Sequence, residues 1–121
     1  MKLKDIIDEL NLEVKSGADW LDNEISGGYE SDLLSDVLAH SKEGNIWITL
    51  QIHHNIVAVA STKGLSGILL INGRVPEEET IRKAEEERIP ILVSAMPAFE
   101  VVGRLYSLGI PGTHTDAGIG V

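Results

Sequence analysis

Residues 46–93, which read IWITLQIHHNIVAVASTKGLSGILLINGRVPEEETIRKAEEERIPILV, decide the fold. They hold three apolar runs, at 46–50, 67–71 and 89–93. Two segments of helical character, 55–63 and 76–88, separate these runs. Runs that are apolar on both faces are typical of strands buried in a parallel sheet, and their alternation with helices predicts a sheet covered by those helices. The stretch therefore predicts successive β–α units joined by right-handed crossovers.

Both helices inside this stretch carry end signals. The first is predicted over 55–63 and ends at Gly64, the residue type that most readily takes the left-handed conformation of a helix end. The second is predicted to begin with Pro76 at its first position and to reach Arg88. Glutamates fill its first turn, where the helix dipole favours anions. Two ion pairs between residues four apart are expected along it, Glu78 with Arg82 and Glu79 with Lys83.

The first third of the chain is less regular. Apolar residues three and four apart predict a helix over 2–10, and alternation predicts a half-buried strand over 12–15. An extended piece follows at 25–29. Ser31-Asp32 then offers an N-cap for a short helix. The apolar residues of that helix are expected to share one buried face: Leu33, Leu34, Val37 and Leu38.

The last predicted helix opens at Pro97 and ends at Gly109. Its core-facing residues are predicted to be Phe99, Val102, Leu105 and Tyr106. Together these elements predict the α/β class: one compact domain over 1–110, with a mostly parallel sheet flanked by helices. Residues 111–121 form a Gly-rich C-terminal tail without periodicity, expected to be mobile unless a partner orders it.

Composition excludes several classes of protein. Ten Lys and Arg against 19 Asp and Glu give a net charge of −9. The basic residues are scattered, which argues against nucleic-acid binding and against docking on an anionic membrane. The absence of cysteine excludes disulfides, thiolate metal sites and Cys nucleophiles. No apolar stretch of membrane-spanning length and no signal-peptide pattern occurs, so we expect a cytoplasmic protein.

The common catalytic motifs are also absent. The sequence contains no P-loop, no dinucleotide-binding glycine fingerprint after a strand and no nucleophile elbow. His53-His54 is the most evident metal-ligand pair, but adjacent residues of an extended segment point in opposite directions. We therefore predict no metal site and no cofactor.

Polar residues follow the carboxyl ends of two predicted strands, where ligands of open α/β sheets bind. After the first strand these are Thr49, Gln51 and His54. After the second they are Asn72, Gly73 and Arg74, just before a helix N-terminus whose free N–H groups attract anions. Each candidate has an alternative. Thr49 and Gln51 would belong to an alternating solvent face, and the histidines to an ordinary strand-to-helix connection. Residues 72–74 would form a β–α turn whose arginine pairs with a local glutamate.

Ser26-Gly27-Gly28 is the third candidate contact. Two adjacent glycines in an extended piece indicate either a bulge or a place where the backbone approaches something closely. The second interpretation includes a phosphate or a backbone carbonyl. The candidate ligand-binding set thus comprises Ser26, Gly27, Gly28, Thr49, Gln51, His54, Asn72, Gly73 and Arg74.

Several separated segments resemble the DRTGG domain family. They are 22–29, 31–37, 72–80, 91–94 and 103–106, and the resemblance extends over roughly residues 1–110. The Asp-Arg of the family stands here as Asp22-Asn23, and its Thr-Gly-Gly as Ser26-Gly27-Gly28. The resemblance implies an α/β sandwich similar to the N-terminal domain of HPr kinase/phosphorylase. It also implies a regulatory or dimer-forming module, of the kind found beside CBS-domain pairs in regulated pyrophosphatases, with no catalytic residue to carry over.

Three functions follow from these observations. The first is a non-catalytic regulatory module that homodimerises and senses a small anionic ligand such as an adenine nucleotide. The second is a ligand-free scaffold that binds a partner enzyme. The third is a small enzyme that uses His54, Arg74 and polar groups at the strand ends. Trp47 and Tyr29 are the residues predicted for a dimer surface.

Overall fold

A computed structural model describes residues 1–113; most of the predicted tail, residues 114–121, lies outside the described residues. The strands are β1 (Glu13–Ser16), β2 (Gly27–Glu30), β3 (Asn45–Thr49), β4 (Gly67–Leu70) and β5 (Ile91–Val93). The α-helices are α1 (Leu3–Leu10), α2 (Leu34–His40), α3 (Asn55–Lys63), α4 (Glu78–Glu87) and α5 (Ala98–Ser107). A 3-10 turn, Ala18–Trp20, precedes β2.

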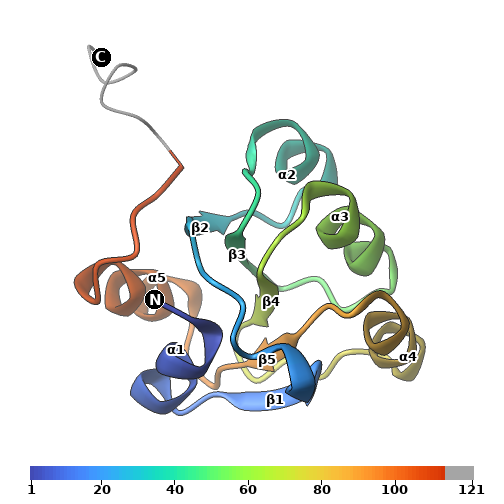
Figure 1. Cartoon of the computed structure of the whole chain (residues 1–121), viewed down its shortest axis with the longest axis horizontal. Helices are drawn as coiled ribbons and strands as arrows, with labels where there is room; N and C mark the ends of the chain where they lie inside the picture. Colours follow the sequence, from blue (N-terminus) through green and yellow to red (C-terminus); the bar gives the residue numbers. More distant parts are fainter. Residues whose placement is uncertain (114–121) are drawn as a thin grey trace.

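The strands form one five-stranded sheet in the order β1-β5-β4-β3-β2. Strands β2 to β5 are parallel, and β1 pairs with β5 antiparallel at one edge. Helices α2, α3 and α4 cover one face, while α1 and α5 cover the other (Figure 1). The predicted α/β class with a mostly parallel, helix-flanked sheet is therefore confirmed.

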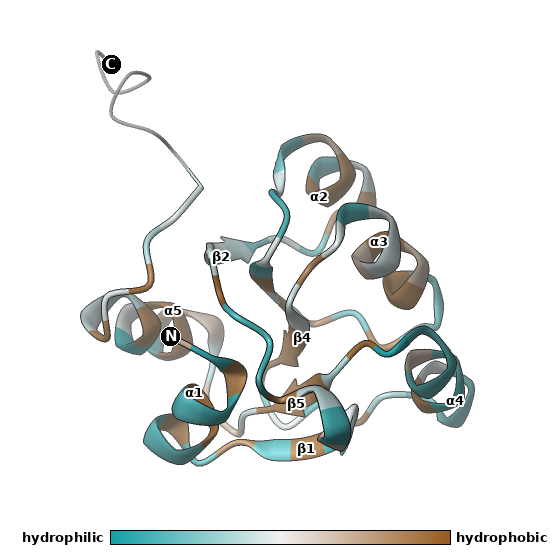
Figure 2. Ribbon diagram, viewed as in Figure 1, coloured by the Kyte–Doolittle hydropathy of each residue, from teal (hydrophilic) through white to brown (hydrophobic). Residues whose placement is uncertain are grey.

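Each face of the sheet has its own hydrophobic core. One core joins the sheet to α1 and α5, and the other joins it to α2, α3 and α4. Strands β3, β4 and β5 are buried along their whole length because helices cover both of their faces. Figure 2 shows β4 and β5 in hydrophobic colours and α4 mostly in hydrophilic ones. The three apolar runs of the sequence are thus the three inner strands.

Local signals set most element boundaries. Helix α3 ends at Gly64, which has a φ of 64° and whose N–H donates to the carbonyls of Ala60 and Ser61. Gly17 has a φ of 76°, and a Cβ there would lie 2.5 Å from the Cα of Pro90. Glycine is required at this position on both counts. At Gly17 the chain therefore passes directly over Pro90, the residue just before β5.

Two predicted helix starts are wrong. Helix α2 begins at Leu34 with no side-chain cap, because its N-cap residue is Leu33. The Asp32 carboxylate accepts from Thr49 of β3 and from the N–H of Leu50 instead. Its apolar residues do not share a buried face: only Val37 is buried, and Leu33 and Leu38 are exposed. Helix α4 begins at Glu78, two residues later than predicted, because Pro76 lies before the N-cap.

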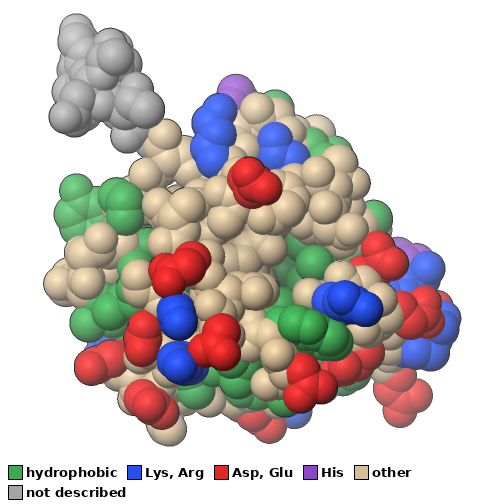
Figure 3. Space-filling model, in the orientation of Figure 1, with side chains coloured by type: hydrophobic (Ala, Val, Ile, Leu, Met, Phe, Trp, Pro, Cys, Tyr) green, Lys and Arg blue, Asp and Glu red, His purple; other side chains and the backbone are tan. Residues whose placement is uncertain are grey.

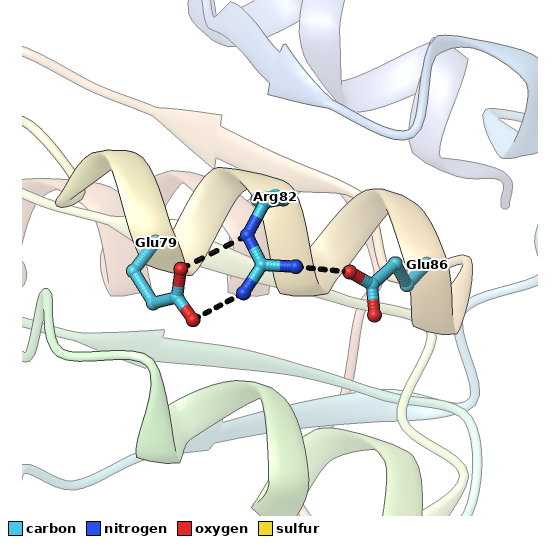
Figure 4. A network of polar contacts seen from close by, with 3 residues as sticks. All are labelled: Glu79, Arg82 and Glu86. Carbon is cyan, nitrogen blue, oxygen red and sulfur yellow. Dashed lines mark hydrogen bonds and ion pairs between the residues drawn. The ribbon is translucent and has the colours of Figure 1, made fainter.

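The ion pairs on α4 also differ from the prediction. Arg82 binds Glu79 through two nitrogens and Glu86 through a third (Figure 4). The planar guanidinium reaches one turn in each direction, so it prefers a bidentate carboxylate to the predicted pair with Glu78. All three side chains are more than 40% exposed, so these pairs contribute little to stability.

Helix α5 is rotated relative to the prediction. Val101 and Leu105 face the core, whereas Phe99, Val102 and Tyr106 are exposed. The predicted inward face is thus wrong at three of its four residues. Its helix boundaries, Pro97 as N-cap and Gly109 just after the end, are close to those expected.

Within residues 1–113, no helix is long and apolar enough to cross a membrane.

Candidate functional site

Asp32 organises the carboxyl ends of β2 and β3. Its Oδ1 accepts hydrogen bonds from Thr49 Oγ1 at 2.9 Å and from the Leu50 backbone N–H at 2.7 Å. The side-chain amide of Gln51 donates to the Asp32 backbone carbonyl at 2.8 Å. The predicted ligand contacts Thr49 and Gln51 therefore hold the loop after β2. Thr49 is fully buried, so a ligand reaches it only by displacing Asp32.

The two histidines lie side by side. The ring centroids of His53 and His54 are 4.0 Å apart. The opposed orientation expected for an extended segment is wrong, because the chain turns into α3 at this point. His53 Nδ1 accepts the backbone N–H of Asn55. Among the residues that the structure describes, no group of three or more His, Asp or Glu side chains could hold a metal ion.

The turn after β4 lies at a topological switch. The chain leaves β4 toward α4 on one face, and leaves β5 toward α5 on the other. Asn72 and Gly73 both have positive φ, and their N–H groups donate to the carbonyls of Met96 and Ser94 at 2.9 and 2.8 Å. Ligands of open α/β sheets bind where neighbouring loops diverge in this way. The predicted turn 72–74 is therefore fixed to the loop that leads into α5.

A hollow of about 210 Å³ opens beside this turn, and we call it the switch hollow. Its lining residues lie in or next to β1, the turn and β5: Asn11, Glu13, Lys15, Gly73, Arg74, Val75, Val93 and Ala95. Lys15 pairs with Glu13 at 3.0 Å. Arg74 is exposed and forms no ion pair with another described residue. Arg74 is therefore the cation available to a ligand here.

The N-terminus of α4 does not assist anion binding. Glu78 and Glu79 occupy its first turn, and their carboxylates repel an approaching anion from the free N–H groups. Because the Gly73 N–H is bonded to Ser94, the group of this turn that is left to contact an anion is the Arg74 side chain. The predicted anion contact does not depend on the helix end that the sequence suggested.

Ser26, Gly27 and Gly28 lie at the other end of the strands, where the parallel strands begin. The structure thus separates them from the other candidate residues by the length of a strand. The register between β2 and β3 is continuous, so the glycines form no bulge. The backbone approach comes from the chain itself: Gly28 N–H donates to the Pro111 carbonyl at 2.8 Å, and a Cβ on Gly27 would lie 2.9 Å from that oxygen.

The preceding residues also have structural contacts. Asp22 pairs with Lys4 at 2.9 Å, and this hydrogen-bonded pair lowers the pKa of the Asp22 carboxyl. The side-chain amide of Asn23 donates to the Ser66 carbonyl at 3.1 Å. These contacts tie the segment before β2 to α1 and to the start of β4.

Neither residue predicted for a dimer surface is freely exposed. Trp47 is fully buried in β3, and its indole N–H donates to the Ser31 carbonyl at 2.8 Å. The Trp47 prediction is therefore wrong. Tyr29 is half-buried, and its hydroxyl donates to Asp36 at 2.8 Å. The exposed aromatic side chains are instead Phe99 and Tyr106 on α5, which the sequence placed in the core.

The carboxylates beside β2 are perturbed in opposite directions. Glu30 is exposed, but partial desolvation of its carboxylate, followed by repulsion from Asp32 and Asp36, raises its pKa. The hydrogen bond from Tyr29, followed by one from Ser31, lowers the pKa of Asp36. An acid whose pKa is raised by folding loses native stability as pH rises through that pKa, and an acid whose pKa is lowered gains it.

This difference predicts two opposite effects of neutralising the carboxylates. Glu30→Gln should raise the free energy of unfolding at pH 7, by well under about 1 kcal/mol because water screens this exposed group, and the gain should vanish below pH ~4. Asp36→Asn should lower the free energy of unfolding at pH 7. This effect should shrink as the pH falls below the pKa of an unperturbed aspartic acid, because the carboxylate is then increasingly protonated. Urea unfolding of both variants between pH 3 and 8 measures these effects. A loss of stability in both variants at pH 7 would contradict the opposite signs.

Comparison with known proteins gives a fold relationship. No family model and no curated protein matches this chain. A solved structure does match: the CBS and DRTGG domains of the regulatory region of Clostridium perfringens pyrophosphatase, complexed with the activator diadenosine tetraphosphate. The TM-score is 0.68 at 19% sequence identity. The match covers 91% of this chain and 47% of the other, so this chain spans about half of that region. The two proteins share a fold.

Proposed function

We propose that this chain is a non-catalytic regulatory module that homodimerises and senses a small anionic ligand, such as an adenine nucleotide, in the switch hollow. The observation that carries the proposal is Arg74, an exposed and unpaired cation among the described residues, beside a backbone turn at the switch point. The shared fold supports it, because the similar region is described as regulatory and as bound to a dinucleotide activator.

Two of the strand-end polar groups that the enzyme hypothesis would use already have partners inside the molecule. The Thr49 hydroxyl donates to the Asp32 carboxylate, and the Gln51 side-chain amide donates to the Asp32 carbonyl. A catalytic base or nucleophile needs a free atom within reach of the substrate. These contacts argue against Thr49 and Gln51 as catalytic groups and favour a binding role.

The size of the switch hollow indicates how a nucleotide would bind. At about 210 Å³, it is smaller than the roughly 300 Å³ at which small-molecule pockets begin. We therefore expect it to receive the phosphate groups, which bind Arg74 bidentately, while the nucleoside lies on the surface outside.

The hydrogen bonds of the turn connect this hollow with α5. Asn72 and Gly73 donate to the carbonyls of Met96 and Ser94, and α5 begins at Ala98. A ligand that orders the turn also orders the residues that lead into this helix. This link provides a physical route from ligand binding to the surface that α5 presents.

Thermal unfolding with a panel of AMP, ADP, ATP, diadenosine tetraphosphate and inorganic phosphate tests the ligand proposal. A ligand at ten times its Kd stabilises the native state by about 1.4 kcal/mol, which raises Tm by roughly 5 °C. Arg74→Gln should remove the shift. Lys42→Gln, which deletes an exposed charge near the start of β3, should retain it. If no panel member shifts the wild-type Tm, the nucleotide proposal fails.

The exposed face of α5 also favours a second candidate function, a ligand-free scaffold for a partner enzyme. The two candidates give different results in the same experiment. A scaffold should show no Tm shift with any small anion and should co-purify with its partner enzyme. A regulatory module should respond to one panel member without any partner present.

A further inference from the structure

We propose that the outward face of α5 is a two-fold interface between two copies of this chain, with the two α5 helices packed antiparallel. We call this face the α5 outer face; it comprises Phe99, Glu100, Val102, Gly103, Arg104 and Tyr106. The inference rests on the homodimerisation proposed above and adds the surface, the orientation and the contacts.

The first observation is the exposure of large apolar side chains on this helix. Phe99 is 86% exposed and Tyr106 71%, while Val101 and Leu105 hold the helix to the sheet on its other side. Figure 3 shows hydrophobic side chains at the left of the molecule, where α5 lies in Figure 1, whereas charges of both signs cover α1. Clustered exposed aromatics are typical of the centre of an interface.

The second observation is the shape around these side chains. A hollow of about 480 Å³ runs between α1 and α5, and its lining includes Glu9, Phe99, Gly103 and Arg104. Gly103 lies at the middle of the helix, and nothing approaches within 4 Å of the position of a Cβ there. The absent side chain lets the backbone of another helix come close at this point.

The third observation is charge. Glu100 and Arg104 lie on the side of the outer face nearer α1, and neither forms an ion pair with another described residue. A two-fold axis that lies in the interface and runs perpendicular to the helices makes the two helices antiparallel. Residues on one lateral side of the α5 outer face then meet residues from that same side of the second copy. If the axis crosses between Val102 and Gly103, Glu100 lies within about one residue rise, 1.5 Å, of the level of Arg104 of the second copy.

The same axis aligns the aromatic residues. Positions 99 and 106 are equally distant from the midpoint of 102 and 103, so Phe99 faces Tyr106 of the second copy, twice in the dimer. A parallel pair of helices would instead place Glu100 against the apolar side that carries Tyr106. The antiparallel arrangement alone matches apolar with apolar and acid with base, which is the self-complementarity an isologous interface requires.

Single cysteines provide the first test, because the wild-type chain contains none. Val102→Cys lies beside the proposed axis, leaves Gly103 intact, and should be cross-linked between two copies by a short bismaleimide. Leu33→Cys is the matched control, since Leu33 is 64% exposed at the N-cap of α2. Cross-linking at position 102 and not at 33 supports the interface. Equal cross-linking at both positions, or none at 102 in a folded variant, overturns it.

Exchanging charges provides the second test. Glu100→Arg or Arg104→Glu alone places like charges opposite each other and should weaken self-association, whereas the double exchange should restore it. Phe99→Ala, which removes a central aromatic residue, should raise the dimer Kd roughly 30-fold or more, and Leu33→Ala should not change it. Sedimentation measures all five variants. If the wild type dimerises and the variants do too, with unchanged Kd, the α5 interface is wrong while homodimerisation stands. If the wild type is a monomer at every concentration, the proposed homodimerisation itself fails.

Discussion

Trp47→Ala is expected to lower the free energy of unfolding by about 3–5 kcal/mol, because it empties the centre of one core. The Trp47 side chain is fully buried in the central part of the sheet, and its loss also leaves the Ser31 carbonyl without its indole donor. Native domains have only about 5–15 kcal/mol of stability in total. The variant should therefore unfold at a Tm roughly 10–20 °C below that of the wild type, as followed by circular dichroism.

Trp20→Ala is the matched control for this prediction, since it makes the same chemical change at a half-buried tryptophan in the 3-10 turn. Its effect should be less than half as large. The comparison also separates two roles for Trp47. If Trp47→Ala abolished self-association and left Tm unchanged, the residue would be an interface residue, as the sequence suggested, and the buried position would be contradicted.

Asp32→Ala should cost about 2–3 kcal/mol, the second largest expected effect, although the residue is exposed. Its carboxylate accepts hydrogen bonds from the Leu50 N–H and from the fully buried hydroxyl of Thr49. Removing the acceptor leaves a buried donor unpaired, so the folded state bears the full desolvation cost of that donor. Urea unfolding measures the change.

Two further variants assign this cost to the contact with Thr49. Asp32→Asn retains one acceptor oxygen and should lose less stability than Asp32→Ala. Thr49→Val removes the donor, so Asp32→Ala in that background should cost at least about 1 kcal/mol less. Additive effects of the two changes would show that the hydrogen bond between them contributes nothing.

The sheet could be predicted from the sequence because its signals are local. A run such as 67–71 has no polar face, so it fits only a strand covered on both sides. Gly64 ends α3 where the sequence places it, because the left-handed conformation of the last residue is a property of that residue alone. The antiparallel position of β1 beside β5 depends on pairing between segments that are distant in the sequence. The residues of neither strand indicate this pairing by themselves.

The rotation of α5 could not be predicted from periodicity. Val101 and Leu105 form one apolar stripe, Phe99, Val102 and Tyr106 form another, and both repeat at helical spacing. Only the sheet underneath decides which stripe is buried. The sequence contains one further signal: the apolar residues of this helix span an arc of about 160°, wider than the roughly 100° stripe that usually faces a core.

The candidate site was predicted in part. Thr49, Gln51 and His54 come to the same edge of the sheet as residues 72–74, because parallel strands end together. Ser26-Gly27-Gly28 does not, because this segment begins its strand instead of ending it. Polar residues beside a strand indicate a candidate ligand contact only when they follow its carboxyl end, where ligands of open α/β sheets bind. Residues that precede a strand lie at its amino end, away from this site.

Sedimentation equilibrium of the wild-type chain, with and without saturating adenine nucleotide, tests the central claim of a self-associating, ligand-sensing module most directly. The chain mass is 13.1 kDa, so we predict a reversible dimer at twice that value, 26.2 kDa. Its association constant should change when nucleotide is added, because the turn at 72–73 is bonded to the loop that leads into α5. A single species of 13.1 kDa at every concentration, unaffected by nucleotide, would contradict the account.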